Sequence, residues 1–163
     1  MTFSISFMDT PPEYPYDDPF AKAARGAIVL GGFREEFLAS LGEWTEEGYR
    51  QQWKRSIRSL LDGERKAVLI TTFSSPTSAS HLEWWALYRE GEKVLVQNQL
   101  VFFKDIQGVF DVNRAVDALR EHQSHGEEGT RISEWVVSIN ELRDFAEQTG
   151  DRNTGDRDVA GSL

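Results

Sequence analysis

The feature that most constrains the fold is a stretch in which one amphipathic helix precedes three apolar segments. Residues 45–63 place apolar side chains on one helical face: Tyr49, Trp53, Ile57, Leu60 and Leu61. Thr45 suits the N-cap of this helix, and Gly63 suits its C-terminal cap. Three segments follow, each long enough to cross a sheet: residues 66–73, 82–90 and 93–103. This order predicts a sheet with a helix packed against it.

The last two of these segments flank Gly91, which predicts a β-hairpin. Trp84, Ala86 and Tyr88 alternate with Trp85 and Leu87, so the first strand of the hairpin has two apolar faces and is expected inside the sheet. In the second strand, Gln97 and Gln99 interrupt the apolar pattern. A buried amide without partners costs about 1–3 kcal/mol, so we expect both side chains to face solvent or a partner.

The N-terminal part contains two further strand patterns and a proline-rich segment. Residues 3–7 alternate like a strand at a sheet edge, and residues 9–19 hold four of the five prolines. These prolines predict an arm that either contacts a partner or packs its tyrosines onto the core. Residues 27–33 predict a strand that bends at Gly31 and Gly32 and runs toward the helix. The alternative is a short helix that carries Phe33, Phe37 and Leu41 on one face.

The C-terminal part predicts two helices separated by a strand. The first helix begins at Asp111 and covers residues 111–123, the strand covers residues 134–139, and the last helix covers residues 140–148. We therefore expect a single α+β domain at residues 1–148, with a mostly antiparallel sheet of about five or six strands and helices packed against it. The polar residues 149–163 predict a flexible tail.

Composition excludes several classes of function. The chain has no cysteine, which excludes disulfides, thiolate zinc sites and cysteine nucleophiles. It has no apolar run of about 18 residues and no signal-peptide pattern at its start, so we expect a cytoplasmic protein without membrane contact. The net charge of −9 argues against a nucleic-acid partner and favours a basic one. Acidic composition is also a common route to solubility.

Catalytic motifs are absent from the sequence, which has no nucleophile elbow, P-loop or kinase signature. His122 and His125 lie three residues apart and could bind a metal with Glu121, Glu127 or Glu128. A solvated helix end, where a histidine meets the negative end of the dipole, is the simpler interpretation. We therefore predict no catalytic residue, no metal and no cofactor.

The central stretch also carries a family resemblance. The residues concerned are Trp44, Tyr49, Gln52, Trp53, Leu69, Ile70, Trp85, Leu87, Tyr88, Arg89, Gln97, Asn98 and Gln99. In this order and spacing, residues 33–103 resemble the immunity proteins of bacterial contact-dependent growth inhibition systems. The proline-rich arm and the C-terminal tail lie outside the resemblance.

The resemblance implies a small, cytoplasmic, non-enzymatic protein. Its partner would be a cognate toxin C-terminal domain delivered by a neighbouring cell, and the protein would block the toxin's active site. Many such toxins are nucleases with basic sites, which an acidic protein complements. From charge and loop placement, the candidate toxin-binding residues are Glu13, Asp17, Asp18, Glu35, Glu36, Glu46, Glu47, Glu127 and Glu128. The alternatives are a small metal-dependent enzyme that uses His122 and His125, or a generic interaction adaptor.

Overall fold

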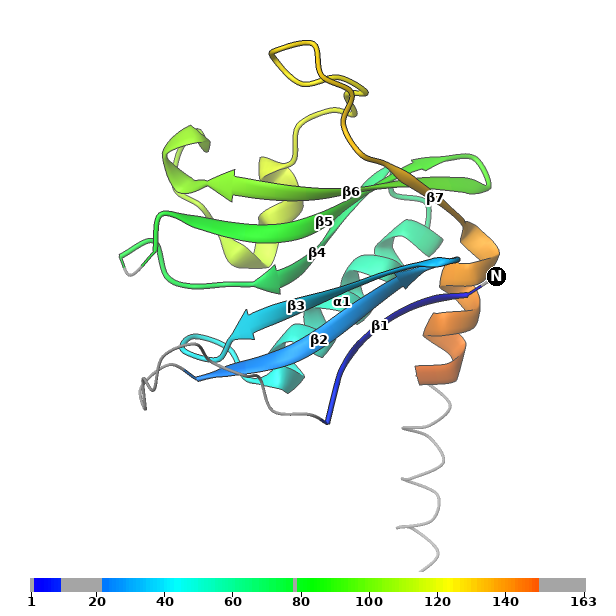
Figure 1. Cartoon of the computed structure of the whole chain (residues 1–163), viewed down its shortest axis with the longest axis horizontal. Helices are drawn as coiled ribbons and strands as arrows, with labels where there is room; N and C mark the ends of the chain where they lie inside the picture. The colour runs from blue at the N-terminus through cyan, green and yellow to red at the C-terminus, as the bar shows by residue number, and fades with distance from the viewer. Residues whose placement is uncertain (1, 10–21, 78, 150–163) are drawn as a thin grey trace, which may run out of the picture.

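The computed structural model describes residues 2–9, 22–77 and 79–149, which contain two antiparallel sheets (Figure 1). The first sheet has the order β1-β2-β3, with β1 (Phe3–Phe7), β2 (Ala23–Leu30) and β3 (Phe33–Ser40). The second sheet has the order β4-β5-β6-β7, with β4 (Lys66–Thr72), β5 (His81–Glu90), β6 (Lys93–Phe102) and β7 (Trp135–Ser138). The helices are α1 (Glu46–Leu61), the 3-10 helices η1 (Phe103–Asp105) and η2 (Val112–Ala118), and a last helix at residues 139–149. The α+β class and the antiparallel pairing are confirmed, and the strands divide between two sheets.

The chain reverses at Gly31 and does not bend there, so the expected bend is wrong. Gly31 has φ +64° at the first position of a two-residue turn, which leads β2 into β3 with Leu30 opposite Phe33. Such a turn has the twist that a hairpin requires. The alternative short helix is also wrong, because the spacing of Phe33 and Phe37 is even and places both on one face of a strand equally well.

The caps of α1 are those that the sequence predicts. Thr45 Oγ1 accepts a hydrogen bond from Gly48 N at 3.1 Å. Gly63, just after the helix, has φ +114°, a conformation that side chains with a Cβ rarely adopt. The helix therefore begins and ends where local chemistry dictates.

The buried face of α1 lies along the edge of β4. Gln52 Nε2 donates to Val68 O at 2.9 Å, and Gln52 Oε1 accepts from Ile70 N at 2.9 Å. Trp53 Nε1 donates to Ile70 O at 2.7 Å. An uncovered edge strand offers its backbone groups to other chains. These two side chains occupy that edge, so α1 closes one side of the second sheet.

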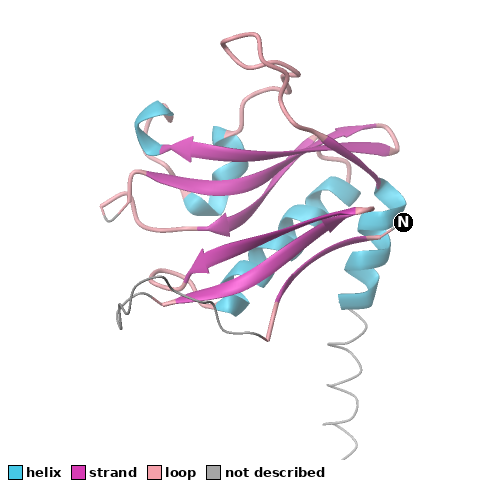
Figure 2. Ribbon diagram, viewed as in Figure 1, coloured by secondary structure: helices cyan, strands magenta, loops and turns pink. Residues whose placement is uncertain are grey.

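The first sheet meets the second sheet along β3. Ser40 N donates to Thr72 Oγ1 at 3.2 Å at one end of β3. At the other end, the Phe33 ring stacks on Trp135, with centroids 4.3 Å apart. Figure 2 shows the strands of the second sheet above those of the first. Tryptophans fill the core between these elements: Trp53, Trp84 and Trp85 are all buried.

The segment after η1 departs from the prediction. Asp111 caps η2 by accepting from Asn113 N at 3.0 Å, but the expected helix through residue 123 is wrong, because the 3-10 helix η2 ends at Ala118. The following residues are held against the second sheet, where Lys66 Nζ donates to Leu119 O at 3.0 Å. This long-range bond favours an extended chain over a continued helix.

The strand β7 and the last helix agree with the sequence pattern, and Ser138 Oγ accepts from Glu141 N at 3.1 Å at the start of that helix. In the described part of the chain, no helix has the length and apolarity that crossing a membrane requires. Residues 10–19 of the expected arm and residues 150–163 of the expected tail lie outside the described residues.

Candidate functional site

Two grooves flank the C-terminal half of β6, one on each face of the second sheet. The groove that we call the amide groove has a volume of about 390 Å³ and includes Trp84, Tyr88, Gln97, Gln99, Arg120 and Gln123 in its lining. The groove that we call the acidic groove has a volume of about 530 Å³ and includes Arg25, Glu35, Glu36, Leu38, Glu83 and Asn98. Side chains alternate along a strand, so Gln97 and Gln99 point to one face of the sheet, and Asn98 between them lines both grooves.

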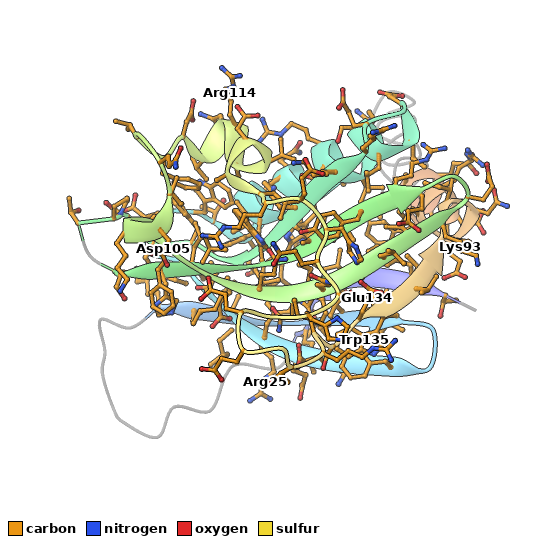
Figure 3. All side chains as sticks on the ribbon, turned by 90° about the horizontal axis from the view of Figure 1, so that it is seen from above. Arg25, Lys93, Asp105, Arg114, Glu134 and Trp135 are labelled. Carbon is orange, nitrogen blue, oxygen red and sulfur yellow. The ribbon has the colours of Figure 1, made fainter. Side chains whose placement is uncertain are left out.

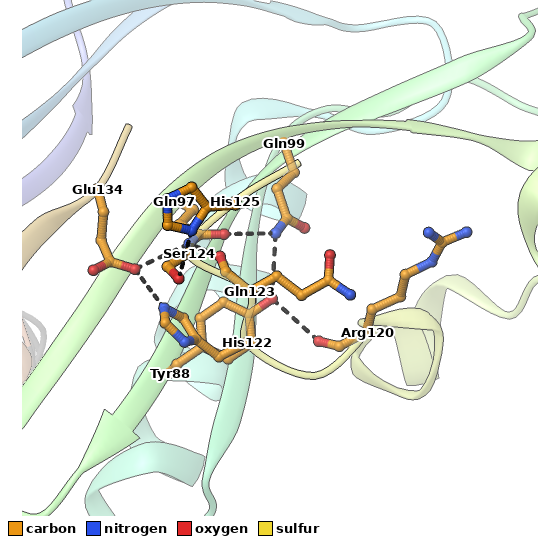
Figure 4. Close-up of polar contacts among 9 residues, drawn as sticks. All are labelled: Tyr88, Gln97, Gln99, Arg120, His122, Gln123, Ser124, His125 and Glu134. Atoms are coloured by element: carbon orange, nitrogen blue, oxygen red, sulfur yellow. Dashed lines mark hydrogen bonds and ion pairs between the residues drawn. The ribbon is translucent and has the colours of Figure 1, made fainter. Parts of the chain in front are cut away.

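A chain of hydrogen bonds runs through the amide groove (Figure 4). Trp84 Nε1 donates to Gln99 Oε1 at 2.9 Å, and Gln99 Nε2 donates to Tyr88 Oη at 3.2 Å. Gln97 Nε2 donates to Glu134 Oε1 at 2.9 Å and to Gln123 O at 2.9 Å. Gln97 is only 1% exposed, so the expectation that it faces solvent or a partner is wrong. Its amide is buried at low cost because it has partners on both sides.

The hydroxyl of Tyr88 ties the segment after η2 to the sheet. It donates to Arg120 O at 3.1 Å, and burial is the main cause that raises the pKa of Tyr88 above its ordinary value. A buried phenol that donates a hydrogen bond stays neutral, because its ionised form would lose both hydration and the bond. Hydrogen bonds therefore hold the polar side chains of the amide groove in place.

The two histidines of the proposed metal site have separate partners. His122 Nε2 lies 2.5 Å from Glu134 Oε1, whereas His125 Nδ1 lies 3.1 Å from Ser124 Oγ (Figure 4). Glu121 pairs with Lys66 Nζ at 3.1 Å. Among the described residues, no group of three or more His, Asp or Glu side chains could hold a metal ion. The arrangement anchors the segment before β7 to the sheet.

The acidic groove lies where β3 crosses β5 and β6. It brings three carboxylates, from Glu35, Glu36 and Glu83, together with one arginine. Glu35 Oε2 accepts from Asn98 Nδ2 at 3.1 Å, which links the two sheets. Leu38 is 48% exposed at the side of the groove. Figure 3 shows Arg25 projecting at the margin of the molecule. An excess of carboxylates beside exposed apolar surface favours a basic protein partner.

Among the described residues, the acidic side chains that the sequence singled out lie in three separate places. Glu35 and Glu36 share the acidic groove, while Glu46 and Glu47 both pair with Arg50 in the first turn of α1, at 3.5 and 3.6 Å. The others lie elsewhere or outside the described residues: Glu127 and Glu128 are exposed in the loop before β7, and Glu13, Asp17 and Asp18 are not described.

Sequence reasoning missed Glu83. A charge within the apolar strand His81–Glu90 was the available signal, because a carboxylate in a central strand must reach solvent or a partner.

Two antiparallel sheets closed by one helix, with polar and acidic grooves along a strand, define a small α+β protein with features of a protein-binding surface. The family model described as the CdiI N-terminal domain matches residues 39–145, and the chain belongs to this family. This membership confirms the resemblance inferred from the sequence.

Two relatives extend the comparison. The immunity protein CdiI of Enterobacter cloacae subsp. cloacae is 29% identical over 119 residues, which are 73% of this chain and 81% of that protein. A solved CdiA-CT/CdiI toxin and immunity complex from Enterobacter cloacae contains a chain with a TM-score of 0.80 and 25% identity. That match covers 92% of this chain and 99% of that chain. The likeness therefore includes both sheets, not only the matched family segment.

Proposed function

We propose that this protein is an immunity protein that binds a cognate toxin domain and neutralises it by occluding the toxin's active site. The observation that supports this most directly is the TM-score of 0.80 to a chain of a toxin and immunity complex, over 92% of this chain. Inhibition of this kind needs a surface and no chemistry of its own, so the protein acts without catalysis. The protein acts in the cytoplasm, where it binds a toxin that has entered the cell.

Charge supports a basic toxin, such as a nuclease. The chain carries a net charge of −9, and the acidic groove concentrates three of its carboxylates on one surface. A nuclease site must attract phosphate and is therefore basic, so an acidic surface that covers it is complementary. We take Glu35, Glu36 and Glu83 as the centre of the contact. Glu46, Glu47, Glu127 and Glu128, and Glu13, Asp17 and Asp18 of the arm, remain further candidate contacts.

Growth rescue tests the function. Cells carry an inducible toxin domain, taken from the coding region immediately upstream of this protein's own, with or without the protein. We expect rescue of growth, and co-purification of the protein with an inactivated toxin variant at equal stoichiometry. Toxicity that persists at full expression, together with no complex between the purified partners, would show that the proposal is wrong.

A charge-neutralised variant tests the surface. The triple change Glu35→Gln, Glu36→Gln and Glu83→Gln is expected to slow association about tenfold at low salt and less at high salt, because steering between charges is screened. The matched control neutralises three exposed carboxylates at other places: Glu64, Glu90 and Glu92. Both variants change the net charge equally. If the control slows association as much as the groove variant, net charge matters and the groove does not.

A further inference from the structure

The backbone groups of β6 point alternately toward β5 and toward β7. Phe103 N, just after the strand, donates to Ser80 O on the β5 side at 3.0 Å. Glu92 O, just before the strand, accepts from Ile139 N on the β7 side at 2.9 Å. Because the direction alternates along a strand, the even-numbered residues of β6 direct their N–H and C=O groups to the β7 side.

The strand β7 covers only the first part of that side. Its pairing with β6 ends at Val96, which lies opposite Trp135, and Figure 1 shows β7 along one end of β6 only. The remaining even-numbered residues, which we call the open edge, are Asn98, Leu100 and Phe102. Leu100 is 50% exposed and Phe102 is 37% exposed.

Two other strand edges carry hydrogen bonds from side chains, one along β4 and one at the end of β3. Gln52 and Trp53 take the backbone groups of β4, as described above. On β3, Thr72 Oγ1 accepts from Ser40 N, and Tyr49 Oη donates to Ser40 O at 2.6 Å. An edge strand left with unpaired backbone groups is a template for another strand.

Both grooves border the open edge, so their lining residues are the side chains that an added strand would contact. Its side chains would point alternately to the two faces, one set toward Gln97 and Gln99 in the amide groove. The other set would lie beside Asn98, whose Nδ2 is 3.1 Å from Glu35 Oε2. Neighbouring strands are about 4.8 Å apart, so a lysine or arginine at that position reaches the carboxylate.

We propose that an extended segment of the toxin domain adds to the open edge as a further strand of the second sheet, with a basic side chain directed at Glu35. This inference rests on the proposed function and names the surface that performs it. Main-chain pairing supplies affinity in such strand addition, and the grooves supply specificity through alternate side chains. The excess of carboxylates in the acidic groove favours the basic toxin over an acidic second copy of this chain.

Residue-resolved amide hydrogen exchange of the full chain, free and bound to the inactivated toxin domain, tests the proposal. We expect the amides of Asn98 and Leu100 to exchange at least about tenfold more slowly in the complex. The amides of Gln99 and Val101, which face β5, are slow in both states and serve as the internal control. A complex that leaves Asn98 and Leu100 fast overturns the strand addition and leaves the proposed function intact. If no complex forms, both the strand addition and the proposed function are wrong.

Two other outcomes would also overturn the proposal. If the open-edge amides are already slow in the free chain and light scattering shows a dimer, a second copy occupies the edge. The change Leu100→Pro removes the N–H that faces the open edge and leaves the pairing with β5, so we expect binding to weaken about tenfold or more. Leu100→Ala keeps that N–H and is the matched control. If a folded Leu100→Pro variant binds the toxin domain as tightly as the control does, the proposed pairing is wrong. If the proline variant does not fold, the hydrogen-exchange experiment alone tests the proposal.

Discussion

Replacing Gln52 by leucine tests how α1 closes the edge of the second sheet. Gln52 is 6% exposed and bonds both Val68 O and Ile70 N, each at 2.9 Å. The leucine has a similar volume but leaves both backbone groups buried without a partner, at about 1–3 kcal/mol each. Burial of the apolar side chain returns about 1 kcal/mol. We expect Gln52→Leu to lower the free energy of unfolding by about 1–5 kcal/mol, a large part of a typical total of about 5–15 kcal/mol.

Urea unfolding, followed by far-UV circular dichroism and tryptophan fluorescence, measures this loss. With a slope of about 2 kcal/mol per molar urea, the midpoint should fall by about 0.5–2.5 M with the slope unchanged. The control is Gln51→Leu on the same helix, where the exposed amide bonds only Glu47 Oε1, at 2.8 Å. We expect the control to stay within about 0.5 kcal/mol of the parent. Equal midpoints for the two variants would refute the view that Gln52 substitutes for a strand partner.

Three further predictions concern the core and the amide groove. Burial raises the pKa of Tyr49 to about 12, so the contribution of Tyr49 to stability is complete below pH 10 and is lost as the pH rises through 12. In alkaline unfolding, the free energy of unfolding should therefore fall with pH less steeply in Tyr49→Phe than in the parent, by up to about 1.4 kcal/mol per pH unit. A Cβ at Gly26 would lie 2.4 Å from the ring of Phe37, so in thermal unfolding Gly26→Ala should lower stability by about 1–3 kcal/mol. The control is Gly32→Ala, which should be nearly neutral because a Cβ there meets nothing within 4 Å. Gln97→Leu removes the donor that bonds Gln123 O and Glu134 Oε1, so limited proteolysis should cut the segment before β7 faster than in the parent. Unchanged cleavage rates would contradict the role of Gln97 in anchoring that segment.

The elements that the sequence predicts well are those whose signals are local. The cap residues Thr45 and Gly63 and the turn residue Gly91 act within a few positions of the chain, and the structure places each as expected. The turn at Gly31 has the same local chemistry as that at Gly91, but the shorter apolar pattern around it did not distinguish a hairpin from a bend. Ambiguity arises where an even spacing fits both helix and strand.

The site was less accessible from the sequence because its members come from distant parts of the chain. Glu35 and Glu83 meet only because β3 crosses the second sheet, and no spacing along the chain encodes that crossing. Gln97 was expected at the surface, since a buried amide is costly without partners, and its partners at Gln123 and Glu134 are more than twenty residues away. A single sequence does not show which remote groups will satisfy a buried polar side chain.

The sequence by itself determined the α+β class, the position of α1, the hairpin at Gly91 and the acidic character that favours a basic partner. Periodicity, caps and net charge carry this information, because each depends on neighbouring residues or on composition alone. Only the tertiary structure decided that the strands form two sheets, that β7 stops at Val96 and that two grooves border the open edge. These features depend on where distant strands end and cross, and that is settled by packing of the whole core.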